Sequence, residues 1–200
     1  CDEDMKKVFT RLPSSSAIPL AVRRAQDMFV LMFLLRGLPF VDLAYLRKSD
    51  LRDNVIIYRR RKTGRPLSVT LTPEALELLK KYMNRDSHSP YLFPLLKSGE
   101  GTKEAYREYQ LALRSFNQQL TLLGKVLGLN DRLSSYTARH TWATTAYYCE
   151  IHPGIISEAM GHSSIKVTET YLKPFRNKKI DEANNQIIDF VKHSIAGVVA

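Results

Sequence analysis

The stretch AMGHSSIKVTETYLK, residues 159–173, carries a histidine, a tyrosine and several hydroxyl side chains between them. Gly161 is suited to end one helix, and either of the two serines after His162 can begin the next. Tyr171 follows His162 by nine residues. Taken alone, this spacing fits an ordinary half-buried aromatic on a short helix, because single His and Tyr residues usually serve packing. Three other segments change that interpretation.

The segment SYTARHTWATT, residues 135–145, places Arg139 and His140 near the expected start of a helix. An arginine at this position can direct its guanidinium toward an anion that the helix N-terminus also attracts. The alternative is a surface arginine that caps the preceding loop. The segment therefore indicates an anion site without proving one.

A second segment, YRRRKTGRPLSV, predicts a hairpin that carries five basic residues, namely Arg59, Arg60, Arg61, Lys62 and Arg65. Strand alternation places Arg60 and Lys62 on one face, with the neighbouring arginines on the other. A charged edge hairpin that resists aggregation is the simpler explanation. The clustering of charge at the tip favours contacts with DNA phosphates.

A third segment, FLLRGLPFVDLAYLRKSDL, contains Arg36 at the junction of two expected helices, within an apolar run. A buried arginine needs a carboxylate, a carbonyl or a ligand, because burying an unpaired charge is costly. Asp42 is a candidate structural partner for Arg36, and a bound anion is another.

The apolar periodicity predicts a mainly helical domain with one small antiparallel sheet. Strands are expected at 55–61 and 66–70, joined by a turn at Thr63 and Gly64. Helices are expected from 21 to about 36, after Pro39, from Thr72 with Pro73 in its first turn, at 102–127, from a cap at Ser135 to 147, from 153 to 160, and at about 177–193. In the last helix, Ile180, Ala183, Ile187 and Val191 are expected to face inward.

Composition narrows the class of partner. The chain has 200 residues, a formal net charge of +10 and a pI of about 9.6, an excess that favours a polyanion such as nucleic acid. The longest apolar stretch, residues 28–35, is too short to span a bilayer, so no membrane partner is expected. Cys1 and Cys149 form neither a disulfide framework nor a metal-like pair, which fits a reducing, cytoplasmic setting. The chain begins without Met, so we interpret it as part of a longer protein.

The order of these segments resembles the catalytic domain of tyrosine recombinases, the phage integrase family, in its mobile-element integrase branch. The resemblance rests on GLPFVDLAYLRKSDL, the KTG hairpin, YTARHTWAT and MGHSSIKVTETY, and it covers nearly the whole chain. It implies that family's fold, mainly α with a small antiparallel sheet. It also implies a site-specific DNA recombinase that cleaves and rejoins strands through a covalent 3′-phosphotyrosine, without a metal, ATP or another cofactor.

The resemblance implies roles for particular residues. Tyr171 matches the nucleophile and Arg139 the second catalytic arginine. His162 matches the late histidine that donates to a phosphate oxygen, and Lys62 matches the hairpin lysine that acts as general acid. His140 matches the second letter of the Arg-His pair and is expected to buttress Arg139 near the DNA.

Two positions depart from the family pattern. Pro39 stands where the first catalytic arginine follows Gly-Leu, and our hypothesis is that Arg36, about one helical turn earlier, substitutes for it. Tyr136 stands where a histidine comes three residues before Arg139. A neutral phenol can donate a hydrogen bond to phosphate but is a poor base near neutral pH.

The resemblance further implies double-stranded DNA as partner, a homotetramer on DNA, accessory DNA-bending or directionality proteins, and a cytoplasmic, nucleoid-associated location. Residues 1–20 are interpreted as the linker from an N-terminal DNA-binding domain, and residues 21–200 as the catalytic domain. The helix at 177–193 packs either on its own core or on a neighbouring subunit. The alternatives are a type IB topoisomerase-like enzyme and a catalytically inactive DNA-binding relic.

Overall fold

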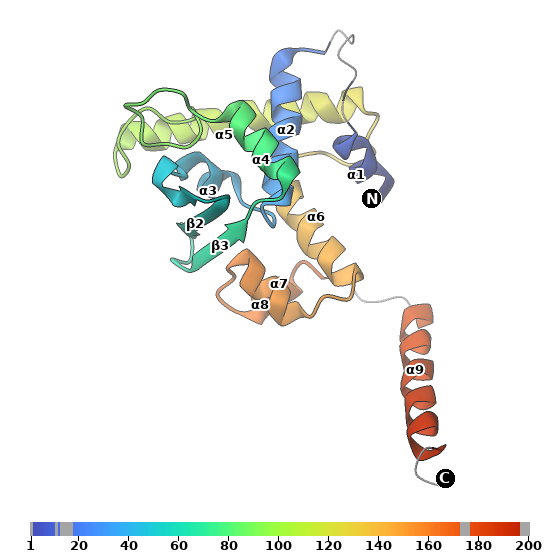
Figure 1. The fold of residues 1–200 in the computed structure, drawn as a ribbon. Coiled ribbons are helices and arrows are strands. Elements are labelled where there is room, and N and C mark those ends of the chain that lie inside the picture. The colour runs from blue at the N-terminus through green and yellow to red at the C-terminus, as the bar shows by residue number, and fades with distance from the viewer. Residues whose placement is uncertain (1, 11, 13–17, 173–176, 197–200) are drawn as a thin grey trace.

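A computed structural model describes residues 2–10, 12, 18–172 and 177–196 (Figure 1). It confirms the predicted fold class, since helices dominate and one small antiparallel sheet lies beside them. The helices are α1 (Asp2–Phe9), α2 (Leu20–Leu34), α3 (Phe40–Tyr45), α4 (Pro73–Tyr82), α5 (Lys103–Val126), α6 (Ser135–Tyr148), α7 (Pro153–Met160), α8 (Ile165–Glu169) and α9 (Asn177–Ala196).

Helix α2 is the centre of the main core. Eight of its fifteen residues are buried, among them Phe29, Leu31 and Met32, so the helix is apolar on nearly every side. A helix of this kind must be surrounded, and α4, α5 and α6 pack against it. Helix α5 contributes Phe116, Leu120 and Leu123 to this core. The main core therefore holds the start of α6 in place.

Helix α1 also packs on this core. Val8 is fully buried, and the Gln26 side chain donates hydrogen bonds to the carbonyl oxygens of Val8 and Thr10 at 2.8 and 2.9 Å. Residues 13–17 of the predicted linker lie outside the described residues. The division of the chain at residue 20 stays a prediction.

The sheet has the order β1-β2-β3, with strands Leu51–Arg52, Val55–Arg59 and Pro66–Thr70. Strands β2 and β3 pair in the predicted antiparallel hairpin, with Ile56 opposite Val69. Strand β1 was not predicted, because two residues carry too little periodicity to reveal a strand. Strand β2 ends two residues before the predicted limit. The chain turns at Arg60, whose carbonyl accepts a hydrogen bond from the Gly64 amide at 2.7 Å.

The helix ends follow local chemistry. Thr72 caps α4 by accepting a hydrogen bond from the Ala75 amide, with Pro73 in the first turn as predicted. The capping residue of α6 is Ser134, one residue before the predicted Ser135. Gly161 ends α7 in the left-handed conformation, with φ of 64°, as the glycine in the opening stretch indicated.

The cluster formed where α6, α7 and α8 meet, and the last helix, α9, are separate from the main core. Ala143, Ile156, Met160 and Tyr171 form a small second cluster where α6, α7 and α8 meet. Helix α9 extends away from the body in Figure 1. The prediction that its apolar stripe faces inward is wrong for this structure, since Ile180, Ile187 and Val191 are exposed, Ile187 by 64%.

None of the helices in the described ranges is long and apolar enough to cross a membrane.

Gly37 offers a stability test, because its backbone is left-handed (φ of 68°) and a Cβ there would lie 2.9 Å from the Arg139 Cα atom. We expect Gly37→Ala to lower the free energy of unfolding by clearly more than the about 1–2 kcal/mol that a left-handed backbone alone costs an L-residue. Gly128→Ala is the matched control, because Gly128 is also left-handed but has open space around it. Urea unfolding followed by circular dichroism measures both, and equal losses would contradict the close approach.

Candidate active site

Tyr171 lies just beyond α8, with its ring inside the second cluster. Its side chain is only 8% exposed and packs against Ala143, Ile156 and Met160. Its amide donates to the Thr168 carbonyl at 2.9 Å, and its own carbonyl accepts from the Thr144 hydroxyl at 3.4 Å. The backbone of Tyr171 is thus held by α6 and α8 together.

Arg139 is buried in the first turns of α6. Its guanidinium donates to the carbonyl oxygens of Gly37 at 2.9 Å and Met160 at 2.8 Å, so it joins the α2–α3 junction to the end of α7. Burial and then the charge of Arg60 lower the pKa of Arg139. The nearby Tyr171 phenol acts in the opposite direction, so this phenol and the Arg139 guanidinium lie close together.

His162 follows Gly161 directly and lies parallel to Tyr171, with ring centroids 5.4 Å apart and planes 12° apart. Its Nδ1 is 2.8 Å from the Thr168 hydroxyl, while its buried Nε2 has no partner among the described residues. Burial, followed by the charge of Arg139, lowers the pKa of His162 to about 4. The role of Thr168 was missed, although its place six residues after His162, on the next helix, was a usable signal.

Tyr136 and His140 complete an aromatic group around the phenol. Their ring centroids lie 6.0 and 5.6 Å from that of Tyr171. Burial, together with a hydrogen bond to Tyr171, raises the pKa of Tyr136 to about 12. At neutral pH Tyr136 is therefore a hydrogen-bond donor and not a base.

The tip of the hairpin reaches the turn that carries His162. Thr63 donates to the Gly161 carbonyl at 3.0 Å, and Arg65 donates to the Ser163 carbonyl at 3.2 Å. Lys62, directly before Thr63, is exposed and forms no hydrogen bond or ion pair with the described residues. Its charge contributes to the lowered pKa of His162, after burial and the arginines Arg139 and Arg60. The structure therefore brings Lys62 to the same site.

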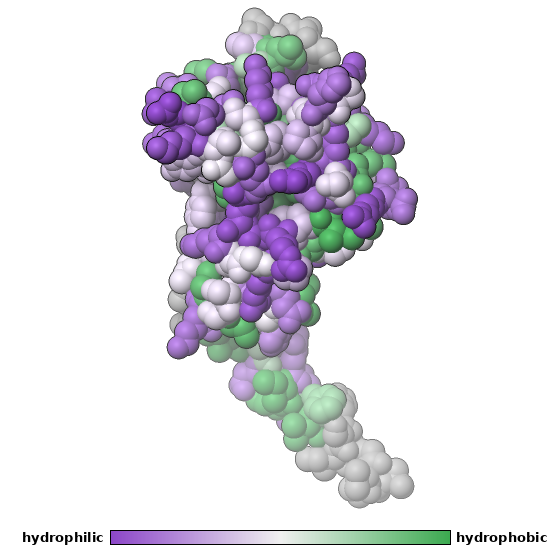
Figure 2. All heavy atoms as spheres, turned by 90° about the vertical axis from the view of Figure 1, so that its left-hand side faces the viewer, coloured by the Kyte–Doolittle hydropathy of each residue, from purple (hydrophilic) through white to green (hydrophobic). Residues whose placement is uncertain are grey.

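The predicted DNA-contacting arginines occupy different environments. Arg59 donates across the turn to the Gly64 carbonyl at 3.1 Å and is exposed. Arg61 lies 3.8 Å above the Tyr45 ring and pairs with Glu100, which also pairs with Arg47. Nothing in the local sequence indicated Glu100, because it is distant from the hairpin along the chain. Figure 2 shows hydrophilic residues across much of one face of the body.

Arg60 is the exception, because it is buried with Asp42. Its Nη1 pairs with Asp42 Oδ2, while Asp42 Oδ1 accepts from the Arg61 amide at 3.0 Å. The suggestion that Asp42 partners Arg36 is therefore wrong. Arg60 continues the inward face of Ile56 and Tyr58, as strand alternation predicts. Lys62 does not share that face, because the chain has turned before it.

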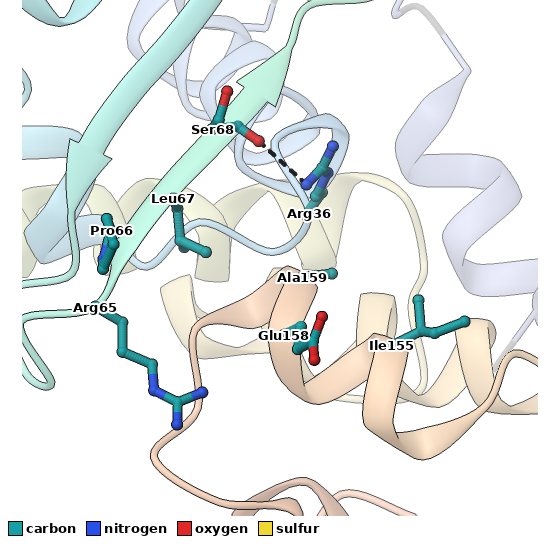
Figure 3. A pocket seen from close by; sticks show the side chains of 8 residues that line it. All are labelled: Arg36, Arg65, Pro66, Leu67, Ser68, Ile155, Glu158 and Ala159. Atoms are coloured by element: carbon teal, nitrogen blue, oxygen red, sulfur yellow. Dashed lines mark hydrogen bonds between the residues drawn. The ribbon is translucent and has the colours of Figure 1, made fainter.

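Arg36 shares a groove with Arg65, but no hydrogen bond joins it to Tyr171 or Arg139. Its guanidinium donates to the Ser68 carbonyl at 3.3 Å, from a backbone with φ of 58°. It lines an open groove of about 560 Å³ between β3 and α7, with Arg65, Ile155 and Glu158 (Figure 3). In Figure 3 the guanidinium points toward Ser68.

Pro39 lines a different hollow, of about 140 Å³, beside Tyr136 and Arg139. A proline side chain has no donor to offer an anion at this place. In the described parts of the chain, no three His, Cys, Asp or Glu side chains are grouped closely enough to hold a metal ion. The charged side chains at this site are cations, except for the buried Asp42, which is an anion.

Comparison with curated proteins found relatives among recombinases. The chain is 28% identical over 174 residues to tyrosine recombinase XerA of Thermococcus onnurineus, covering 86% of this chain and 56% of that protein. It is 27% identical over 163 residues to tyrosine recombinase XerC of Neisseria gonorrhoeae, covering 81% of this chain and 50% of that protein. The chain thus spans about half the length of these relatives.

Solved structures share the fold. A crystal structure of XerA recombinase superposes with a TM-score of 0.61 at 20% identity, over 93% of this chain and 63% of that one. The Tn1549 transposon integrase in complex with transposon right end DNA gives a TM-score of 0.63 at 15% identity, over 94% and 64%. Residues 13–178 match the sequence profile of the phage integrase family, and the chain belongs to that family.

Proposed function

We propose that the chain is the catalytic part of a site-specific DNA recombinase that cleaves and rejoins strands through a 3′-phosphotyrosine. One observation carries the proposal, namely the convergence of Tyr171, Arg139 and His162 with the Lys62 hairpin at one site. Three segments far apart in the sequence supply these groups. Packing alone gives no reason for a phenol oxygen, an arginine and a histidine to meet there.

In the proposed reaction, Tyr171 releases its phenol proton to solvent and its oxygen attacks the phosphorus of a DNA linkage. A bond forms between that oxygen and phosphorus, and the bond from phosphorus to the 5′ oxygen breaks. Lys62, which no carboxylate holds among the described residues, protonates the departing oxygen. The phosphodiester energy stays in the phosphotyrosine, because a phenol is a better leaving group than an alkyl alcohol, so the strand can be resealed.

The cationic side chains stabilise the charge that develops on the phosphate oxygens. Arg139 is held by two carbonyl groups, so its orientation is fixed before DNA arrives. When Thr168 donates to His162 Nδ1, the proton of the neutral ring lies on Nε2, which can then donate to a phosphate oxygen. The lowered pKa keeps that ring neutral at pH 7.

Double-stranded DNA is the proposed substrate, and the net charge of +10 supports it. The structural neighbours that are bound to DNA, a transposon integrase and a XerH recombinase on a difH substrate, support the same partner. Such a protein acts in the cytoplasm, at the nucleoid. We further propose a homotetramer on DNA, joined through α9, on which the apolar side chains of Ile180, Ile187 and Val191 are exposed.

The nucleophile is tested with a nicked duplex taken from the end of the element that encodes the protein, incubated in EDTA. We expect the chain to become covalently linked to the DNA and Tyr171→Phe to form no adduct while it still binds, because only the attacking oxygen is removed. Denaturing electrophoresis detects the adduct, and gel shift detects binding. If the unaltered chain binds DNA but forms no adduct, it is an inactive DNA-binding protein. If a monomer relaxes supercoiled DNA, it is a topoisomerase.

The buried histidine predicts a pH dependence of stability. The unfolded chain, with a histidine pKa near 6.5, binds more protons than the folded chain, with a pKa of about 4. The stability that neutral His162 contributes is complete above pH 6.5 and falls as the pH drops toward 4. His162→Gln should flatten the curve of unfolding free energy against pH in this window, whereas the exposed-site control His88→Gln should not. Identical slopes for all three proteins would exclude a buried neutral His162.

The assembly role of α9 predicts that Ile187→Asp reduces the tetramer on DNA, because a charge replaces an exposed apolar contact. Half-site cleavage, scored by covalent adduct, should remain. Asn185→Asp adds the same charge at an exposed polar position of α9 and serves as control. Analytical ultracentrifugation with paired sites measures the assembly, and an unchanged tetramer in Ile187→Asp would exclude this interface.

A further inference from the structure

We propose that Arg60, and not Arg36, supplies the second guanidinium that contacts the scissile phosphate. This inference rests on the proposed function, because it adds a contact within the same site. The starting point is Pro39, which stands where the family's first arginine is expected and carries no donor. Another cation must take that place if two arginines are to neutralise the transition state.

Unpaired donors show where the missing acceptor lies. Arg60 is only 5% exposed, yet its buried Nε has no partner in the parts of the chain that the structure describes, and the same is true of His162 Nε2. Leaving a buried donor unpaired costs about 1–3 kcal/mol. Two such donors in one site are explained by an acceptor that arrives with the ligand.

Packing places Arg60 against the turn that carries His162. A Cβ at Gly161 would lie 2.8 Å from Arg60 Cγ, so the stem of the arginine runs across this glycine. Gly161 and His162 are neighbours in sequence, and Thr63 of the hairpin donates to the Gly161 carbonyl. The side chains of Arg60 and His162 therefore reach the site from the two sides of the contact between the hairpin and Gly161.

The charges at the site are not balanced. Arg60 is paired with Asp42, but Arg139 donates only to neutral carbonyl groups and no carboxylate pairs with it among the described residues. The charge of Arg60 lowers the pKa of Arg139, so the two buried guanidinium groups lie close enough to repel one another. A phosphate between them would remove this repulsion and complete both sets of donors.

Asp42 fixes the orientation of Arg60 without occupying all of its donors. The carboxylate engages Nη1 with one oxygen and the Arg61 amide with the other, which ties the guanidinium to the hairpin backbone. Arg36, by contrast, points toward Ser68 on the groove beside α7 (Figure 3). Fixed, buried and partly unsatisfied donors are what an electrostatic catalyst requires.

Single-turnover cleavage of the nicked duplex by the full-length recombinase tests the assignment. Arg60→Lys keeps a positive charge for Asp42 but loses the planar fork, and we expect its cleavage rate to fall about 100-fold or more. Arg36→Ala should stay within a few-fold of the unaltered protein. Arg85→Lys is the matched control, the same substitution at an exposed position outside the hairpin. Cleavage by Arg60→Lys at the unaltered rate, or an equal loss in Arg36→Ala, overturns the proposal.

A neutral linkage distinguishes phosphate contact from structural support. A methylphosphonate at the cleavage position has no charge for Arg60 to neutralise, so Arg60→Lys should cleave it nearly as fast as the unaltered protein does. Thermal unfolding checks that the variant is folded. Equal impairment on the charged and neutral linkages would assign Arg60 to positioning alone and overturn the phosphate contact.

A binding measurement separates this inference from the proposed function. In a Tyr171→Phe background, the ratio of dissociation constants for neutral and charged linkages reports the phosphate contact without chemistry. Arg60→Lys should lower that ratio, and the control Arg85→Lys should leave it unchanged. If the unaltered protein never forms an adduct, the recombinase proposal fails while the ratio still decides the role of Arg60. If cleavage occurs and the ratio does not respond to Arg60→Lys, only the Arg60 proposal fails.

Discussion

The site depends on the two hydrogen bonds that Arg139 donates to the carbonyl oxygens of Gly37 and Met160. They join the main core around α2 to the small cluster that contains Tyr171, and they do so from inside the protein, where solvent cannot compete for the donors. Gly37 makes this possible because a side chain there would collide with the backbone of α6. One arginine thus aligns the two halves of the site and remains positively charged toward its open side.

This arrangement also explains how the chain tolerates so much buried charge. Arg60, Arg139 and His162 lie together with Asp42 as the buried carboxylate. The histidine responds by remaining neutral, because burial and the neighbouring arginines lower its pKa to about 4. The resulting surplus of positive charge is unfavourable in the protein alone and favourable around a phosphate. The same feature that weakens the free structure prepares it for the ligand.

Much of this was predictable from local sequence. Thr72 with Pro73, the glycine that ends α7, and the hairpin all follow from short-range rules, and the fold class follows from their sum. The segments near Arg139, His162 and Lys62 could be identified as candidates in the same way. Pairings between distant residues could not. We predicted that Asp42 would pair with Arg36 because the two are close in sequence, but in the structure Asp42 pairs with Arg60. We predicted from apolar periodicity that one side of α9 faces inward. Periodicity does not show whether another part of the protein covers that side.

The Glu100 contact has a consequence for the lysine beside it. Arg61 is held by Glu100 and by the Tyr45 ring, and Thr63 donates to the Gly161 carbonyl, so both neighbours of Lys62 are anchored. A proton carrier has to stay near its target without being bound to a competing anion. By anchoring the residues on either side, the fold restricts the lysine to a small volume of space and leaves the ammonium group itself uncommitted.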